Sequence, residues 1–208
     1  MDKIFEKYSE IFLIQNSKLN LISKNDEKFL WEKHIKDSLA IEKFFEKYHI
    51  NPSGLTMLDI GTGGGFPSVP VAIKYPNLKV TALDSIRKKI NAIEEIKTVL
   101  DIKNLVTICD RAENLTQKFD IVTARAVSGM KTILEYALPR LKKDGYFVAY
   151  KSIKAGEEIE DAKEILQKYN AEVMDIIPYE LPLQENFTRN LVIVEYVKTL
   201  RRYVKFDK

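Results

Sequence analysis

A glycine-rich turn that follows a short apolar stretch is the strongest chemical signal in the sequence. Asp59, Gly61, Gly63 and Gly65 form the pattern D-x-G-x-G-x-G, which leads from a predicted strand into a helix whose first turn contains Pro67. Glycines allow the backbone conformations of such a turn and remove the Cβ atoms that would obstruct a ligand. The turn is therefore predicted to bring its backbone very close to a bound molecule.

The spacing of these glycines separates two kinds of ligand. A dinucleotide fingerprint reads G-x-G-x-x-G, but Phe66 stands where its third glycine is required. The pattern present is instead the form found in S-adenosylmethionine-dependent methyltransferases. The pattern therefore disfavours a nicotinamide oxidoreductase. Tight binding of NAD, without binding of S-adenosylmethionine, would be the evidence for that alternative.

Acidic residues follow the next two predicted strands, at the edge where open parallel sheets bind ligands. Asp84 ends the second strand, about twenty residues after the glycines, where its carboxylate can accept hydrogen bonds from both ribose hydroxyls. The alternative for Asp84 is a helix N-cap before Ile86. Asp110, Ala112 and Glu113 follow the third strand, where this fold usually contacts an adenine ring. A solvated loop acid is the alternative for Glu113.

The fourth predicted strand ends at Arg125, beside the expected position of the methyl acceptor. The Asn/Asp-Pro-Pro-aromatic motif of enzymes that methylate exocyclic amines is absent there, and Cys109 lacks the Pro-Cys context of a C5-pyrimidine nucleophile. The planar guanidinium of Arg125 is suited to binding a carboxylate or a phosphate, and a structural salt bridge is the alternative.

Short apolar runs alternate with amphipathic stretches from Leu55 onward, which predicts an α/β fold with a mostly parallel, seven-stranded Rossmann-like sheet. The predicted strands are residues 56–60, 78–84, 106–108, 119–123 and 146–150, then an antiparallel terminal hairpin of 173–178 and 191–197 around Pro182 and Asn186. Helical periodicity predicts helices over 86–100, 130–141 and 156–169. Lys142-Lys143-Asp144-Gly145 is predicted to end the second of these helices with a basic last turn and a glycine stop.

Two further amphipathic helices are predicted before Leu55, one marked by apolar residues from Ile4 to Phe12 and one by those from Trp31 to Phe45. No long linker separates them from the rest of the chain. We therefore expect one structural domain, in which a helical cap over residues 1–54 packs on a methyltransferase core over residues 55–208.

His34 lies three residues before Asp37 and four before Ser38, so the three side chains share one face of the second predicted helix. This face is predicted to point toward the cofactor cleft. The alternative is a buried histidine that is hydrogen-bonded within the cap.

The composition bounds the class of protein. The chain has 208 residues, a formal net charge of +3 and a single cysteine, Cys109, so we expect a reduced, metal-free, cytoplasmic protein without a signal peptide or membrane span. Bulk charge gives only weak support for a nucleic-acid partner. Residues 198–208 hold five basic side chains against one acid and are a candidate contact surface or a solvated terminus.

The chain resembles the RsmG (GidB) family of bacterial small-subunit ribosomal RNA methyltransferases. The resemblance spans roughly Leu19 to Lys151, with weaker continuation to Val197. It is carried by L-N-L-I from Leu19, by W-E-K-H-I-K-D-S-L from Trp31, by the glycine turn, and by the segments R-A-E (111–113), R-A (125–126) and L-P (138–139). The chain departs from the family pattern at Lys33, Ser68 and Lys151-Ser152, none of which lies in the glycine turn.

The resemblance implies methylation of N7 of a guanine in 16S rRNA, with 16S rRNA or the small ribosomal subunit as partner and S-adenosylmethionine as cofactor. It implies cofactor contacts at Gly61, Phe66, Ala112, Glu113 and Arg125. Since guanine N7 carries a lone pair and no proton, Arg125 and His34 are expected to position the acceptor rather than to act as a general base. We expect a monomer. A small-molecule methyltransferase and a noncatalytic ribosome-assembly factor are the rival functions.

Overall fold

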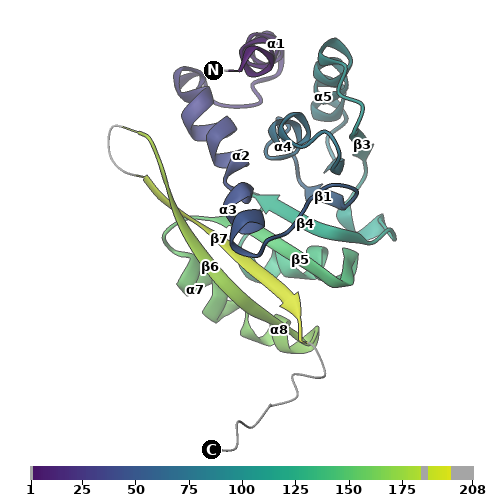
Figure 1. Cartoon of the computed structure of the whole chain (residues 1–208), viewed down its shortest axis with the longest axis vertical. Coiled ribbons are helices and arrows are strands. Elements are labelled where there is room, and N and C mark those ends of the chain that lie inside the picture. Colours follow the sequence, from purple (N-terminus) through teal and green to yellow (C-terminus); the bar gives the residue numbers. More distant parts are fainter. Residues whose placement is uncertain (1, 184–186, 198–208) are drawn as a thin grey trace, which may run out of the picture.

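Seven strands form one mixed sheet in the computed structural model, which describes residues 2–183 and 187–197. Their spatial order is β3-β2-β1-β4-β5-β7-β6 (Figure 1). The strands are β1 (Thr56–Ile60), β2 (Lys79–Asp84), β3 (Leu105–Cys109), β4 (Phe119–Arg125), β5 (Leu141–Lys151), β6 (Ala171–Leu181) and β7 (Phe187–Tyr196).

Strands β1 to β5 pair in parallel, whereas β7 pairs antiparallel with both β5 and β6. The predicted mostly parallel sheet with an antiparallel terminal strand is thereby confirmed. The hairpin between β6 and β7 is present, although Asn186 lies outside the described residues, as does the basic segment 198–208.

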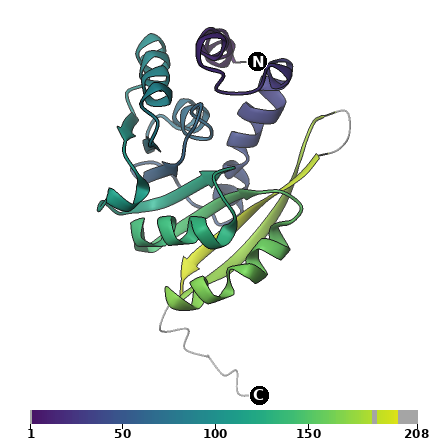
Figure 2. The ribbon, with the colours of Figure 1, turned by 180° about the vertical axis from the view of Figure 1, so that it is seen from behind.

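Helices cover both faces of this sheet (Figures 1 and 2). On one face lie α4 (Ser68–Lys74), α5 (Arg87–Leu100) and the N-terminal helices, which bury apolar side chains in a common core with β1 and β2. On the other face lie α6 (Met130–Ala137), α7 (Ala155–Asp161) and α8 (Lys163–Lys168), which share a second core with β4 and β5. The remaining helical elements are α1 (Lys3–Leu19), η1 (Lys24–Phe29), η2 (Leu30–Lys36), α2 (Asp37–Leu39), α3 (Ile41–Lys47), η3 (Ala112–Asn114) and η4 (Leu138–Arg140).

The prediction that residues 142–145 end a helix is wrong. Helix α6 ends at Ala137, a short 3₁₀ turn follows, and β5 already begins at Leu141. Leu141 continues the helical spacing of the preceding apolar residues, but it pairs with Phe119 of β4 and its side chain is fully buried. Sheet pairing therefore overrides the local helical pattern at this point.

Three other predicted helices differ in detail. The helix expected from Trp31 to Phe45 is a π-helical turn, η2, followed by α2, a turn at Ala40 and α3. The helix expected over 156–169 is divided into α7 and α8 at Ala162. Pro67, expected inside the first turn of a helix, stands one residue before α4.

In the described part of the chain, no helix is both long and apolar enough to cross a membrane.

Gly145→Ala is expected to lower the free energy of unfolding by roughly 1–3 kcal/mol, because an added Cβ forces a backbone shift. A Cβ at this position would lie 2.7 Å from the carbonyl oxygen of Asp120, in the neighbouring strand β4. Urea denaturation measures the change. Gly156→Ala is the control, since its Cβ meets nothing within 4 Å in helix α7. Equal stabilities of Gly145→Ala and the wild type would contradict the close approach.

Candidate active site

Three glycines in the left-handed region shape the turn after β1. The φ angles of Gly61, Gly63 and Gly65 are +67°, +58° and +92°. A Cβ on Gly61 would lie 2.6 Å from Val127 Cγ2, and a Cβ on Gly65 would lie 2.6 Å from Val69 Cγ2. Gly61 and Gly65 are therefore required both by backbone conformation and by packing.

Asp84 ties the glycine turn to the loop after β2. Its Oδ2 accepts a hydrogen bond from the Gly63 amide at 3.0 Å, and its Oδ1 accepts one from the Ile86 amide at 2.9 Å. Helix α5 begins only at Arg87, so Asp84 shapes the loop before the helix and is not its N-cap residue. Each carboxylate oxygen keeps the capacity to accept a further hydrogen bond.

A cleft of about 500 Å³ lies at the C-terminal ends of the parallel strands. It brings together four of the residues predicted to bind a cofactor: Gly61, Asp84, Ala112 and Glu113. The other lining residues are Ile60, Leu83, Ser85, Lys89, Asp110, Arg111, Ala126, Val127 and Tyr136. The loops after β1, β2, β3 and β4 thus all contribute to one cavity, as expected for an open α/β sheet.

Tyr136 is a cleft residue that the sequence pattern missed. It lies on α6, on the flank of the apolar face formed by Met130, Ile133 and Leu134, and its ring is half-buried. The available signal was an aromatic residue set beside the apolar stripe of a predicted helix. An aromatic residue in that position is equally compatible with a place in the hydrophobic core.

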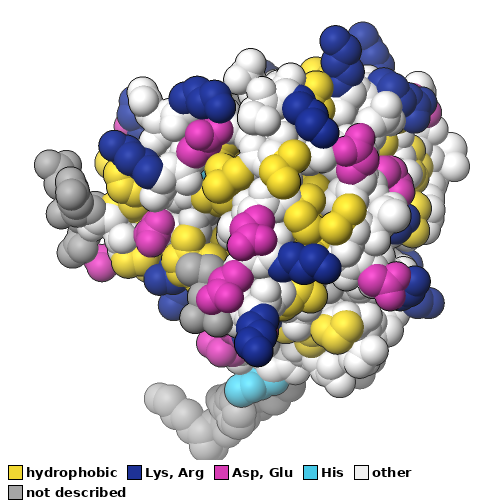
Figure 3. Space-filling view, turned by 90° about the horizontal axis from the view of Figure 1, so that it is seen from above, with side chains coloured by type: hydrophobic (Ala, Val, Ile, Leu, Met, Phe, Trp, Pro, Cys, Tyr) yellow, Lys and Arg dark blue, Asp and Glu magenta, His cyan; other side chains and the backbone are white. Residues whose placement is uncertain are grey.

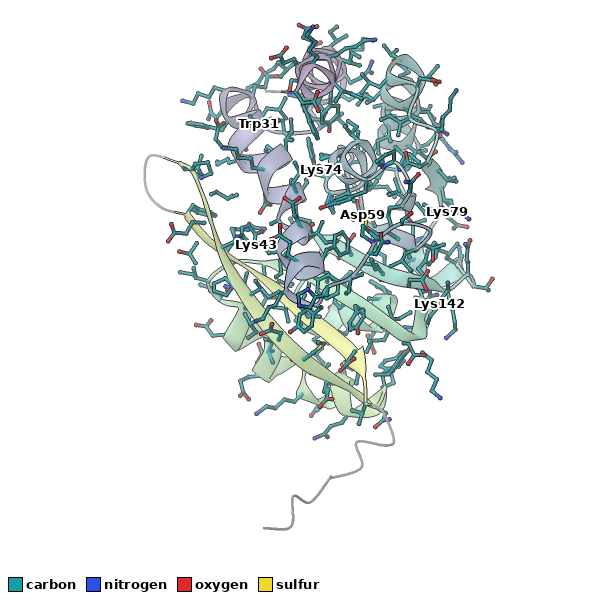
Figure 4. The ribbon with its side chains drawn as sticks, viewed as in Figure 1. Trp31, Lys43, Asp59, Lys74, Lys79 and Lys142 are labelled. Carbon is teal, nitrogen blue, oxygen red and sulfur yellow. The ribbon has the colours of Figure 1, made fainter. Side chains whose placement is uncertain are left out.

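Six predicted site residues do not line the cleft: His34, Asp59, Gly63, Gly65, Phe66 and Arg125. Asp59 is fully buried between β1 and α4 (Figure 4). Its carboxylate accepts hydrogen bonds from the Ser68 amide at 3.2 Å and from Thr123 Oγ1 at 3.3 Å. Burial raises the pKa of Asp59 to about 6. Asp59 therefore anchors the start of α4 beneath the turn, and its direct contact with a cofactor stays a prediction.

Arg125 ends β4 inside a cluster of contacts with the N-terminal helices. Its Nη1 donates to Asp37 Oδ2 at 2.7 Å and to the Lys33 carbonyl at 3.2 Å. Its Nη2 lies 2.8 Å from His34 Nδ1. The guanidinium also lies 5.2 Å from the centre of the Phe66 ring. The structural salt bridge weighed as the alternative for Arg125 is thus present in the structure.

Asp37 extends this cluster to the hairpin of β6 and β7. Its Oδ1 accepts a hydrogen bond from Tyr179 Oη at 2.5 Å, and Arg189 Nε lies 3.5 Å from the same oxygen. Nearby, Tyr150 of β5 donates to the Ser38 carbonyl at 2.7 Å. One buried carboxylate therefore connects the cap, β4 and β6.

His34 packs against Phe66 with its ring centre 5.0 Å away. Burial and, second, the positive charge of Arg125 lower the pKa of His34 to about 4. The imidazole is therefore neutral near pH 7, and Nδ1 accepts from Arg125 while Nε2 carries the proton. Within the described residues, Nε2 is buried and has no hydrogen-bond partner. His34 and Asp37 lie on a common face as predicted, since both contact Arg125. Neither residue lines the cleft, and the prediction that this face points toward the cofactor stays a prediction.

A second ion pair holds the loop between β4 and α6 at the cleft. Lys151 Nζ donates to the Ser128 carbonyl at 2.9 Å and to Glu158 Oε2 at 2.7 Å, and Glu158 Oε2 also accepts from the Met130 amide at 2.9 Å. Val127, which contacts Gly61, belongs to this loop. The pair thus fixes the loop at Ser128 and Met130, directly after the residue that covers the glycine turn.

The imidazole of His34 is expected to titrate with a midpoint near 4 rather than near its ordinary 6.5. An NMR titration of the histidine signals measures this midpoint. The variant His49→Gln identifies which of the two histidine signals belongs to His34. Because the folded pKa is the lower one, the unfolded chain binds more protons between these values, so stability falls as pH falls through this window. Arg125→Met should raise the midpoint. A midpoint near 6.5 in the wild type would show that the imidazole is solvated.

Comparisons with known proteins agree with the sequence resemblance. Residues 1–188 match the profile of the family GidB, described as rRNA small subunit methyltransferase G. The chain is 36% identical over 204 residues to the ribosomal RNA small subunit methyltransferase G of Staphylococcus saprophyticus, covering 96% of this chain and 84% of that protein. The Bacillus subtilis protein of the same name is 35% identical over 206 residues, with the same coverage.

The fold is also similar to a solved methyltransferase structure. Magnesium protoporphyrin IX methyltransferase from Synechocystis, with bound S-adenosylmethionine, superposes with a TM-score of 0.64 at 16% identity, covering 84% of this chain and 85% of that one. That likeness concerns the fold alone, whereas the match to the family profile spans most of the sequence. The chain therefore belongs to the rRNA small subunit methyltransferase G family.

Proposed function

We propose that this protein transfers a methyl group from S-adenosylmethionine to N7 of one guanine in the 16S rRNA of the small ribosomal subunit. The observation that carries the proposal is family membership over most of the chain. The cleft supports it, because Gly61 of the glycine turn and Asp84 both line it.

The cleft fits the cofactor in size and in chemistry. Its volume of about 500 Å³ lies in the range of small-molecule sites. Gly61 lines it with no side chain to obstruct a ligand, and Asp84 offers acceptors for the ribose hydroxyls. Ala112 and Glu113 are the residues we assign to the adenine. S-adenosylmethionine supplies an activated methyl group on a positively charged sulfonium.

Guanine N7 places few chemical demands on the protein. Its lone pair lies in the plane of the ring and carries no proton, so attack on a methyl group requires alignment rather than proton removal. The groups near the end of β4 suit this task, because the lowered pKa of His34 keeps its imidazole neutral near pH 7 and Arg125 offers hydrogen-bond donors only. We therefore assign positioning, and no general-base step, to these two side chains.

The hydrogen bonds of Arg125 do not use all of its donors. Three of its N–H groups are used by Lys33, His34 and Asp37. A guanidinium has five donors, so about two remain for a carboxylate, a phosphate or a base. In this proposal Arg125 holds η2 against the end of β4 and offers its remaining donors on the acceptor side.

Charge on the surface does not by itself identify an RNA substrate. Basic, acidic and hydrophobic side chains are interspersed on the face seen in Figure 3, so that face presents no field of a single sign. The basic segment 198–208 is proposed to add nonspecific phosphate attraction, and it lies outside the described residues. Recognition of 16S rRNA therefore rests on the family relationship.

The proposal is tested by transfer of labelled methyl from S-adenosylmethionine to small ribosomal subunits from a strain that lacks this protein. We expect label at one guanine, mapped by cleavage at N7-methylguanine. Transfer to a small molecule without RNA would favour a small-molecule methyltransferase. Binding to subunits without any transfer would favour a ribosome-assembly factor.

Asp84→Asn is expected to weaken S-adenosylmethionine binding by about ten- to a hundredfold, as measured by calorimetry, because hydrogen bonds to a charged group contribute about 1.5–3 kcal/mol. Asp161→Asn, at an exposed position in α7, is the matched control. Thermal melting of both variants shows whether either has unfolded. Unchanged affinity in folded Asp84→Asn would remove Asp84 from the cofactor site.

A further inference from the structure

Arg140 is a buried arginine whose recorded hydrogen bonds all go to backbone carbonyls. It ends the short turn η4 between α6 and β5, and its residue is 8% exposed. Nη2 donates to the Glu113 carbonyl at 2.5 Å, Nε donates to the Leu115 carbonyl at 2.9 Å, and Nη1 makes a longer contact with the Tyr136 carbonyl at 3.5 Å. Within the described residues, no carboxylate forms an ion pair with this guanidinium.

These bonds hold the back of the turn η3, which forms part of the cleft wall. The front of the turn is held by Asp110, whose Oδ1 accepts from the Arg111 amide and from Asn114 Nδ2, each at 2.7 Å. Arg140 and Asp110 therefore both fix the turn. Asp110 is exposed at the cleft, whereas Arg140 lies behind the turn and out of contact with the cavity.

A buried positive charge without a counter-ion is costly, because transfer out of water is only partly offset by neutral acceptors. The planar fork of an arginine nevertheless fixes several carbonyls in one rigid arrangement, which the single ammonium of a lysine does not reproduce. The guanidinium thus joins three segments: η3, the residue after it, and α6 at Tyr136. Two of these segments line the cleft.

We propose that Arg140 is a positioning residue for the adenine of the methyl donor, holding the Ala112–Asn114 turn and Tyr136 at the spacing that admits this base. The inference rests on the proposed function, which places the adenine beside Ala112 and Glu113. Adenine carries an amino group that donates a hydrogen bond, next to N1, which accepts one. In hypoxanthine a carbonyl oxygen that accepts replaces the amino group, and N1 carries a proton that it donates. A wall held rigidly distinguishes the two bases, because the wrong base leaves polar groups unpaired.

The test measures the dissociation constants of S-adenosylhomocysteine and of its hypoxanthine analogue, S-inosylhomocysteine, by calorimetry. The wild type should prefer the adenine compound. Arg140→Leu should reduce the ratio of the two constants by about tenfold, the equivalent of about 1.4 kcal/mol. Arg140→Lys, which keeps the charge and loses the fork, should reduce the ratio by a smaller factor.

Asn104→Leu is the matched control. The Nδ2 of Asn104 donates to the carbonyls of Ala72, Tyr75 and Leu78 at 3.1, 3.0 and 2.8 Å. Asn104 directly precedes β3, so these bonds lie at the N-terminal ends of the parallel strands, whereas the cleft lies at their C-terminal ends. Its loss should lower the melting temperature without changing the ratio.

Two outcomes separate failure of this inference from failure of the proposed function. If Arg140→Lys and Arg140→Leu lower only the melting temperature, as Asn104→Leu does, Arg140 is structural and the inference is overturned. If the wild type binds neither compound, the proposed cofactor site fails, and the role of Arg140 fails with it.

Discussion

The ion pair between Asp37 and Arg125 joins parts of the chain that are far apart in sequence. Their side chains are 3% and 11% exposed, and their charged atoms lie 2.7 Å apart. Removing one partner of such a buried pair typically costs 3–5 kcal/mol, roughly, because the other charge is left uncompensated. Asp37 also binds Tyr179 of β6, so the same carboxylate holds the cap to two strands. The acceptor-positioning role that we propose for Arg125 depends on this junction, since Arg125 is at the end of β4.

Two acidic residues support the glycine turn in different ways. Asp59 lies beneath the glycine turn, where its hydrogen bonds fix the start of α4, and burial raises its pKa. Asp84 lies beside the turn, where it binds the Gly63 amide and still borders the cavity. The adenine wall we propose is supported in the same manner, with Asp110 in front and Arg140 behind. Backbone turns form the cavity, and charged side chains hold those turns in place.

The sequence predicted those features that depend on local pattern. The glycine spacing identified the turn, and parallel pairing of β1 with β2 places Ile60 beside Leu83, which brings Asp84 to the turn. The partners of Arg125 could not be predicted, because Asp37 is 88 residues away and the contact depends on how the N-terminal helices pack against the end of β4. The start of β5 was misread because Leu141 satisfies a helical period and a strand pairing equally well. Arg140 gave no signal, since its acceptors are carbonyls, which every residue carries.

The most direct test of this account is a crystal structure of the protein with S-adenosylhomocysteine bound. The account predicts the ligand in the cleft between Gly61 and Glu113, with the ribose hydroxyls on Asp84 and the adenine against Ala112. It also predicts that the sulfur faces the loop after Arg125. A ligand bound elsewhere, or in this cleft with the ribose away from Asp84, would contradict the assignment of the cleft.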